Sequence, residues 1–154
     1  MTEPDPRLAL IYEESVRKLD QQASVLEALR GRTGLLLGAG AVSSSFLAPE
    51  AIKQAGWNWQ VWVGVLCLVV NALLLLLILL PYGGWVFSHK PSILLEDYVT
   101  GEAPRSINGM HRWLSVKNER FVENNRRKMA RLFRMFELAT VLLAVSIVFW
   151  LSAL

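Results

Sequence analysis

Apolar residues are concentrated in three uncharged blocks along the chain, separated by segments rich in charge. The longest block, residues 61–80, reads VWVGVLCLVVNALLLLLILL, and another occupies residues 138–154. Residues 33–49 form a third block that also contains glycines and serines. A helix needs about 20 residues to cross a hydrocarbon core of about 30 Å. The pattern therefore predicts three transmembrane helices.

The charged segment in front of the first block, residues 1–32, has the periodicity of a helix. Its apolar positions recur at spacings of four and three, which puts them on one side of a helix. Because no strong breaker precedes Pro49, one long helix, or two nearly collinear ones, is expected from about residue 6 to about residue 47, with Pro49 as its end. The apolar side is expected to form a cytosolic packing seam, made of Tyr12, Val16, Leu19, Ala23 and Leu26.

Two breaks divide the rest of the chain. Residues 50–60 are expected to form a loop on one membrane face, because they contain tryptophans, which prefer the headgroup region. The sequence PYGGW, which begins at residue 81, ends the second span. Residues 81–137 then form a helical connector, with a short amphipathic helix near residues 93–99 and a long helix that begins near Gly109 and continues into the third span.

The expected fold is an all-α membrane protein. It has three transmembrane helices, long cytosolic helical extensions and one structural domain overall. Residues 1–32 are charged throughout, so no secretory signal peptide is expected there.

Basic residues are divided unevenly among the segments between the blocks, which bears on orientation. Five precede the first block, one (Lys53) lies between the first two, and ten lie between the second and the third. Cytoplasmic segments of membrane proteins carry the excess of lysine and arginine. We therefore expect a multi-pass protein of the cell membrane, with residues 1–32 and 81–137 in the cytoplasm and the C-terminus outside.

The composition agrees with a membrane protein and gives little sign of catalysis. Hydrophobic residues make up 53% of the chain and the mean hydropathy is +0.35. The single cysteine, Cys67, cannot form an internal disulfide, and His89 and His111 have no acid or cysteine at metal-ligand spacing. No serine or cysteine has a recognisable base beside it. We expect no enzyme activity, no metal site and no cofactor.

The glycine-rich part of the first block has two interpretations. Gly38, Gly40 and Ser43 give a loose G-x-G-x-x-S pattern, but a dinucleotide loop needs a preceding strand and a following acid, and both are missing. Small residues on one side of a membrane helix instead permit close backbone packing. That packing could lie within the three-helix bundle of one chain or between subunits. The small-residue face consists of Gly34, Gly38, Ala41 and Ser45.

Asn71 lies near the middle of the second span, where an amide needs a partner. Three roles remain open for it: packing inside the monomer, a contact between subunits, or the lining of a pore. We group it with the small-residue face as a candidate packing or oligomer residue.

A cluster of cations directly precedes the third span. Cations near a membrane surface attract anionic lipid headgroups, and the position of the cluster favours lipid over nucleic acid, which we do not expect as a partner. The candidate lipid-contact residues are Arg126, Arg127, Lys128, Arg131 and Arg134.

Two long stretches, residues 11–48 (IYEESVRKLDQQASVLEALRGRTGLLLGAGAVSSSFLA) and residues 132–151 (LFRMFELATVLLAVSIVFWL), carry a resemblance of pattern. The chain resembles small multi-span membrane proteins of high-GC bacteria and, more distantly, SLATT and Pycsar-type transmembrane effector modules. This resemblance implies oligomers that damage the membrane when a nucleotide signal is sensed. The chain departs from those modules because it has no recognisable sensor domain.

Two classes of function follow. The first is a homo-oligomeric membrane effector or channel-like assembly with a cytosolic helical stalk. The second is a non-conducting scaffold or accessory subunit that binds a partner protein. Membrane lipids are expected contacts in both.

Overall fold

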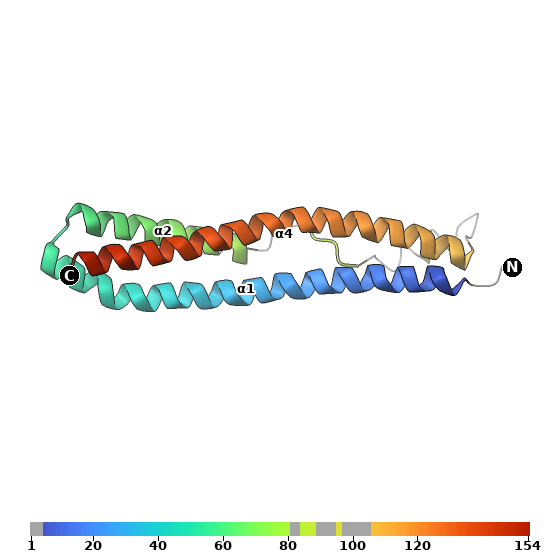
Figure 1. Ribbon diagram of the computed structural model, residues 1–154, viewed down its shortest axis with the longest axis horizontal. Coiled ribbons are helices and arrows are strands. Elements are labelled where there is room, and N and C mark those ends of the chain that lie inside the picture. The colour runs from blue at the N-terminus through green and yellow to red at the C-terminus, as the bar shows by residue number, and fades with distance from the viewer. Residues whose placement is uncertain (1–4, 81–83, 89–94, 97–105) are drawn as a thin grey trace. The chain divides into compact units, whose positions relative to one another are not determined.

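The computed structural model describes residues 5–80, 84–88, 95–96 and 106–154. Three long helices account for most of this part of the chain: α1 (Pro6–Ala55), α2 (Trp59–Leu79) and α4 (Ile107–Ser152) (Figure 1). The described residues contain no strand. All three helices are long and apolar enough to cross a membrane. The predicted all-α fold with three such helices is therefore confirmed.

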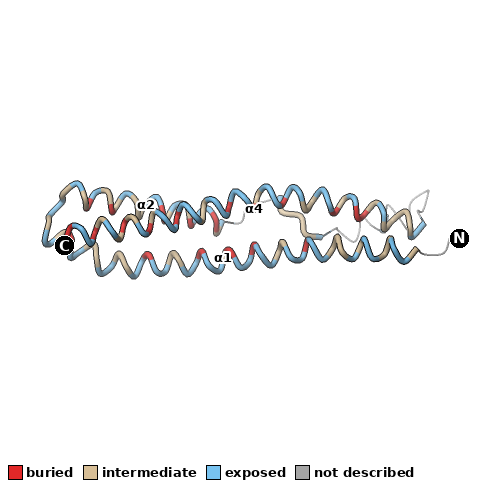
Figure 2. The backbone as a smooth tube through the Cα atoms, viewed as in Figure 1, coloured by how far each residue is buried: buried red, intermediate tan, exposed pale blue. Residues whose placement is uncertain are grey.

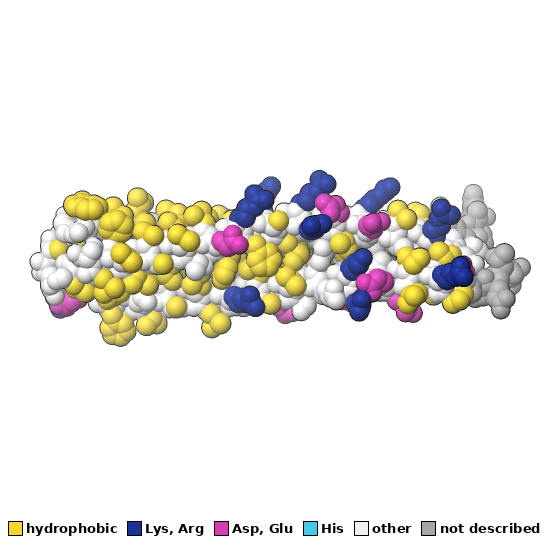
Figure 3. Space-filling model, in the orientation of Figure 1, with side chains coloured by type: hydrophobic (Ala, Val, Ile, Leu, Met, Phe, Trp, Pro, Cys, Tyr) yellow, Lys and Arg dark blue, Asp and Glu magenta, His cyan; other side chains and the backbone are white. Residues whose placement is uncertain are grey.

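The chain folds as two compact units, where the sequence suggested one structural domain. Met1–Leu26 and Tyr82–Met129 form one unit, which we call the charged unit. Glu27–Pro81 and Ala130–Leu154 form the other, which we call the apolar unit. On the face drawn in Figure 3, most of the coloured side chains of the apolar unit are hydrophobic, whereas acidic and basic side chains are spread over the charged unit. The helices α1 and α4 each contribute to both units.

In the apolar unit, α2 runs antiparallel to α1 and α4. Gly64 of α2 lies against Trp150 of α4, while Asn71, two turns further along α2, lies near Gly40 of α1 and level with Leu143 of α4. As residue numbers rise along α2, its neighbours in α4 fall. A core of Ala51, Val61, Trp150 and Ala153 closes the end of the unit where α1 gives way to α2.

In the charged unit, α1 and α4 run parallel and are joined by hydrogen bonds at successive levels. The backbone N–H of Asp5 donates to the Asn108 side chain at 2.8 Å, Asn118 Nδ2 donates to Ser15 Oγ at 2.9 Å, and Gln22 Nε2 donates to the Val122 carbonyl at 2.9 Å. Leu19, Leu26 and Leu114 are buried between them. Red segments in Figure 2 mark this inner side of each helix.

Pro49 does not end α1, so the prediction of a break there, with a loop over residues 50–60, is wrong. The helix continues to Ala55 and the loop is reduced to Gly56, Trp57 and Asn58. Proline removes one backbone donor and disfavours a helix interior by roughly 3 kcal/mol. Burial of Ala51, together with packing of Ile52 and Ala55 against the same core, offsets this cost.

The short loop has the residues that each helix end requires. Gly56 has a φ of +63°, a conformation that other residues rarely adopt, and its N–H donates to the Ile52 carbonyl at 2.9 Å. Asn58 caps α2, because its Oδ1 accepts from the Val61 N–H at 2.9 Å. A three-residue connection therefore reverses the chain.

The other predicted boundaries agree with the helices to within two residues. The second span was expected over residues 61–80 and α2 covers Trp59–Leu79. The last helix was expected from Gly109 without interruption, and α4 runs from Ile107 to Ser152. Most of the short amphipathic helix expected near residues 93–99 lies outside the described residues.

Candidate interaction surfaces

The small-residue face points away from the other helices of its own chain. Gly34, Gly38, Ala41 and Ser45 are all exposed. A methyl group built on Gly34 or Gly38 would meet nothing within 4 Å. The sequence left two places where this face could pack. Among the residues that the structure describes, the face does not pack inside the three-helix bundle of its own chain.

A different glycine makes the close approach inside the bundle. Gly40 is buried, and a methyl group on it would lie 3.4 Å from Leu143 Cδ1 and 3.7 Å from Asn71 Nδ2. Thr33, two turns earlier on the same side of α1, is fully buried and its hydroxyl donates to the Leu29 carbonyl. The helix α1 thus presents two sides, one turned to its own chain through Thr33 and Gly40 and one left uncovered.

Asn71 belongs to the inward side. It is only 1% exposed and its Oδ1 has no hydrogen-bond partner in the described chain. This burial matches the interior role among the three that the sequence left open. An unpartnered buried acceptor costs about 1–3 kcal/mol. The Asn71 amide therefore lowers the folding stability of the chain taken by itself.

Gly64 and Trp150 form a tight contact that sequence analysis did not single out. A methyl group on Gly64 would lie 2.5 Å from Trp150 Nε1 and 2.7 Å from its Cδ1. Trp150 is fully buried and its indole N–H has no acceptor among the described residues. The signal in the sequence was a lone glycine in an otherwise bulky span, which suggests close approach of another helix.

The five candidate lipid-contact cations divide into two groups. Arg126 and Arg127 both lie against Glu123, at 3.9 Å and 3.2 Å, and Lys128 donates to the Gly84 carbonyl and lies over the Trp85 ring. Arg131 and Arg134 are exposed and form no ion pair or hydrogen bond within the described residues. The second pair is therefore the one left free to meet a headgroup.

The predicted seam residues lie on the inner side of the charged unit. Leu19 and Leu26 are buried, and Tyr12, Val16 and Ala23 are half-buried. The Tyr12 ring stacks on His111 of α4, with ring centroids 5.4 Å apart.

Two asparagines of α4 also lie on this inner side. Asn118 Nδ2 donates to Ser15 Oγ, and Asn125 Nδ2 donates to the Val86 carbonyl at 2.9 Å. Polar residues thus share this packing with leucines.

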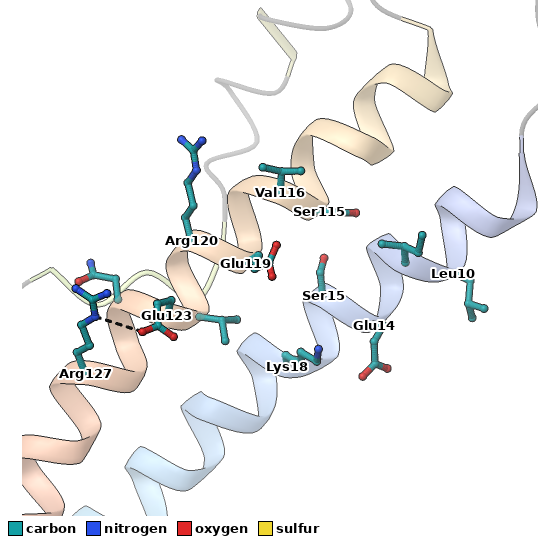
Figure 4. Close-up of a pocket in the computed structure, with 13 residues that line it drawn as sticks. Leu10, Glu14, Ser15, Lys18, Ser115, Val116, Glu119, Arg120, Glu123 and Arg127 are labelled. Atoms are coloured by element: carbon teal, nitrogen blue, oxygen red, sulfur yellow. Dashed lines mark hydrogen bonds and ion pairs between the residues drawn. The ribbon is translucent and has the colours of Figure 1, made fainter.

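A groove of about 970 Å³ runs between α1 and α4 in the charged unit (Figure 4). Leu10, Ile11 and Val116 line it and remain 67%, 54% and 48% exposed. Glu119 and Ser15 point into the space between the two helices, whereas Arg120 and Glu14 point away from it (Figure 4). Residues of both helices line the groove.

Glu14, on the α1 side of this groove, pairs with Arg17 of the same helix. A hydrogen bond from Arg17, 2.7 Å from Glu14, lowers the pKa of the Glu14 carboxyl. Glu14 is solvent-exposed, so the pair contributes little to folding. In the described ranges, no three His, Cys, Asp or Glu side chains gather closely enough to hold a metal ion, and His89 lies outside them.

Comparisons with protein-family models, curated proteins and solved structures found no match to this chain. The fold and its surfaces therefore have to carry any functional argument.

Proposed function

We propose that this chain is the subunit of a homo-oligomeric integral membrane protein. One observation carries the proposal: α1 has a smooth face of Gly34, Gly38, Ala41 and Ser45 that its own chain leaves uncovered. Helices in lipid gain nothing from merely burying apolar surface, so they associate where small residues allow close packing. A second copy of α1, or another helix of a second copy, fits this face.

The surroundings of the face support this choice. Its neighbours on α1 include Leu35 and Phe46, large apolar side chains that are 77% and 74% exposed and suit contact with lipid tails. Ser44 and Ser45 bond to carbonyls of their own helix, so they require no further partner. The small-residue face is a narrow flat strip beside a lipid-facing surface.

We further propose that the assembly acts on the membrane as an effector or channel-like oligomer, with the charged unit in the cytosol. The support is the uneven distribution of basic residues, the uncovered membrane face and the resemblance in pattern to transmembrane effector modules. In this arrangement the spans of the copies pack around a common axis, and the cytosolic helices receive the signal.

The first test is the oligomeric state in mild detergent. Wild-type protein is expected to form a closed assembly, and Gly38→Leu is expected to dissociate it because the added side chain holds neighbouring helices apart. Ala39→Leu is the matched control, since Ala39 is an exposed neighbour outside the small-residue face. A wild-type monomer, or equal effects of the two variants, would contradict the proposed face.

The second test separates the effector from a scaffold. Purified wild-type protein in liposomes is expected to release a trapped dye, and Gly38→Leu is expected to lose that release. An oligomer that leaves the liposomes tight, and that co-purifies from native membranes with a stoichiometric partner, would replace the effector with the scaffold.

A further inference from the structure

The groove between α1 and α4 of the charged unit has features of a protein contact. Three large apolar side chains, Leu10, Ile11 and Val116, stand exposed along it. These residues lie in the part of the chain rich in charge, so lipid does not account for their exposure. Clustered apolar exposure on a polar surface marks an interaction site.

The charges along the groove identify the kind of partner. Its acidic residues are Glu14, Glu119 and Glu123, and its basic residues are Lys18, Arg120 and Arg127. Equal numbers of each sign make the lining neutral. A nucleic acid or an anionic lipid surface requires an excess of cations, whereas a neutral surface with mixed signs can face a copy of itself.

Two of these charged residues, opposite in sign and one on each helix, stand at one level. Lys18 on α1 and Glu119 on α4 form no ion pair with any described residue, although the Lys18 ammonium acts electrostatically on Glu14, one turn away on the same helix. The hydrogen bonds from Asn118 to Ser15 and from Gln22 to Val122 bracket them, so they lie at about the same height along the helix pair. A two-fold axis parallel to the helices leaves the height of every residue unchanged. If a second copy is related by such an axis, Lys18 of one copy and Glu119 of the other are therefore at the same height.

We propose that the groove is a contact between two copies of this chain, in which α1 of each packs along α4 of the other. Copies inserted in one membrane point the same way, so the axis runs parallel to the helices and residues of equal height meet. Lys18 of each copy then pairs with Glu119 of the other, and Leu10, Ile11 and Val116 fill the space between them. Such a self-complementary contact is the usual form of a two-fold interface. The proposal rests on the proposed assembly of copies, but it uses other residues and another unit.

Crosslinking between copies tests the geometry in native membranes. Two differently tagged versions are co-expressed, one with Ile11→Cys and one with Val116→Cys, both with Cys67→Ser. A short bismaleimide is expected to join the two tags. The control replaces Ile11→Cys by Asp20→Cys, because Asp20 is an exposed residue of α1 that does not line the groove. A yield no higher than that of the control would overturn the proposal.

Charge exchange tests the pairing with the same crosslinking pair. Lys18→Glu alone and Glu119→Lys alone are each expected to reduce the crosslink to the control level, because each places like charges opposite each other. The double exchange is expected to restore it. A misfolded variant could not recover in this way, so restoration reports the pair itself. Single variants that crosslink as well as the parent would contradict it.

The two contacts can fail separately. If Gly38→Leu leaves the assembly intact while the groove crosslink forms, the membrane face is wrong and the groove contact stands. If Gly38→Leu dissociates the assembly and the groove crosslink never forms, the groove contact is wrong. A third outcome is that a Lys18→Cys variant is protected from maleimide while no crosslink forms between copies. The groove would then be covered by something other than a second copy, and the proposed contact would be wrong.

Discussion

Gly64 sets how closely α2 and α4 approach each other. Its missing side chain makes room for the Trp150 indole, which is fully buried in the apolar unit. Gly40 limits the approach of α4 less strictly, because a methyl group added to it would lie at ordinary contact distance from Leu143. The glycines of the small-residue face differ from both, since open space surrounds Gly34 and Gly38. Glycines of similar sequence context thus have different purposes, and only the positions of their neighbours separate them.

Gly64→Ala is expected to destabilise the single chain by about 1–3 kcal/mol, because the new methyl group would overlap the indole and force it to move. Thermal unfolding in detergent measures the change. Gly31→Ala is the control: Gly31 lies in α1 with nothing within 4 Å, so alanine there is expected to be neutral or slightly stabilising. Equal losses from both variants would mean that the Trp150 contact does not limit the approach.

The helix α1 shows how packing overrides a local breaker. Its residues 50–55 remain helical after Pro49 because Ala51 is fully buried against α2 and α4. The helix α4 is the opposite case. It contains no helix breaker, so its bounds could be predicted from the sequence. The cations of α4 before the third apolar block also divide into two groups. Those beside Glu123 and Trp85 have partners, whereas Arg131 and Arg134 have none among the residues that the structure describes.

Pro49→Ala is expected to keep the helix and to raise the free energy of unfolding by up to about 3 kcal/mol, because it restores a backbone donor for the Ser45 carbonyl. Circular dichroism during heating in detergent measures both helix content and stability. Glu50→Ala serves as the comparison, since it removes only the exposed pair with Lys53 and is expected to change stability by less than about 1 kcal/mol. A decrease in stability with Pro49→Ala would show that the ring packs favourably in place.

Replacing both Arg131 and Arg134 by glutamine is expected to weaken retention of anionic lipid. Each cation near a membrane surface is worth about 1 kcal/mol, so the pair predicts roughly a 30-fold loss. Native mass spectrometry of protein with anionic and neutral lipids measures it. Replacing Arg126 and Arg127 instead removes the same charge but is expected to have a smaller effect, because Glu123 already holds both. Equal losses would mean that net charge alone governs lipid binding.

For the chain as a whole, we propose one orientation from the three helices that could cross a membrane and the distribution of basic residues. Three spans would put the two termini on opposite sides of the membrane, with the segments of five and ten basic residues in the cytoplasm. The Gly56–Asn58 turn, followed by exposed Trp59 and Trp62, would then lie at the outer face.

Cysteine labelling tests this orientation in cells that carry Cys67→Ser. Lys53→Cys is expected to react with a membrane-impermeant maleimide in intact cells. Asp20→Cys is expected to react only after permeabilisation. Both residues are exposed, so a difference between them reports the side of the membrane. Labelling of both from outside would contradict the proposed orientation.

Much of the fold follows from the order of residues alone. Uncharged blocks of sufficient length specify membrane-crossing helices because a backbone in lipid must satisfy its own hydrogen bonds. The periodicity of residues 12–26 indicated which side of α1 turns inward, and the absence of breakers after Gly109 indicated the length of α4. These are local properties, so they need no knowledge of neighbours.

Contacts between distant residues decided the rest. Pro49 is tolerated because Val61 and Trp150 bury the residues after it, and the small-residue face is uncovered because Gly40, on the other side of α1, makes the inward contact. Asn71 is an interior residue for the same reason. When a helix has small residues on more than one side, its own sequence does not decide which side faces the rest of the chain. The side chains of the neighbouring helices decide it.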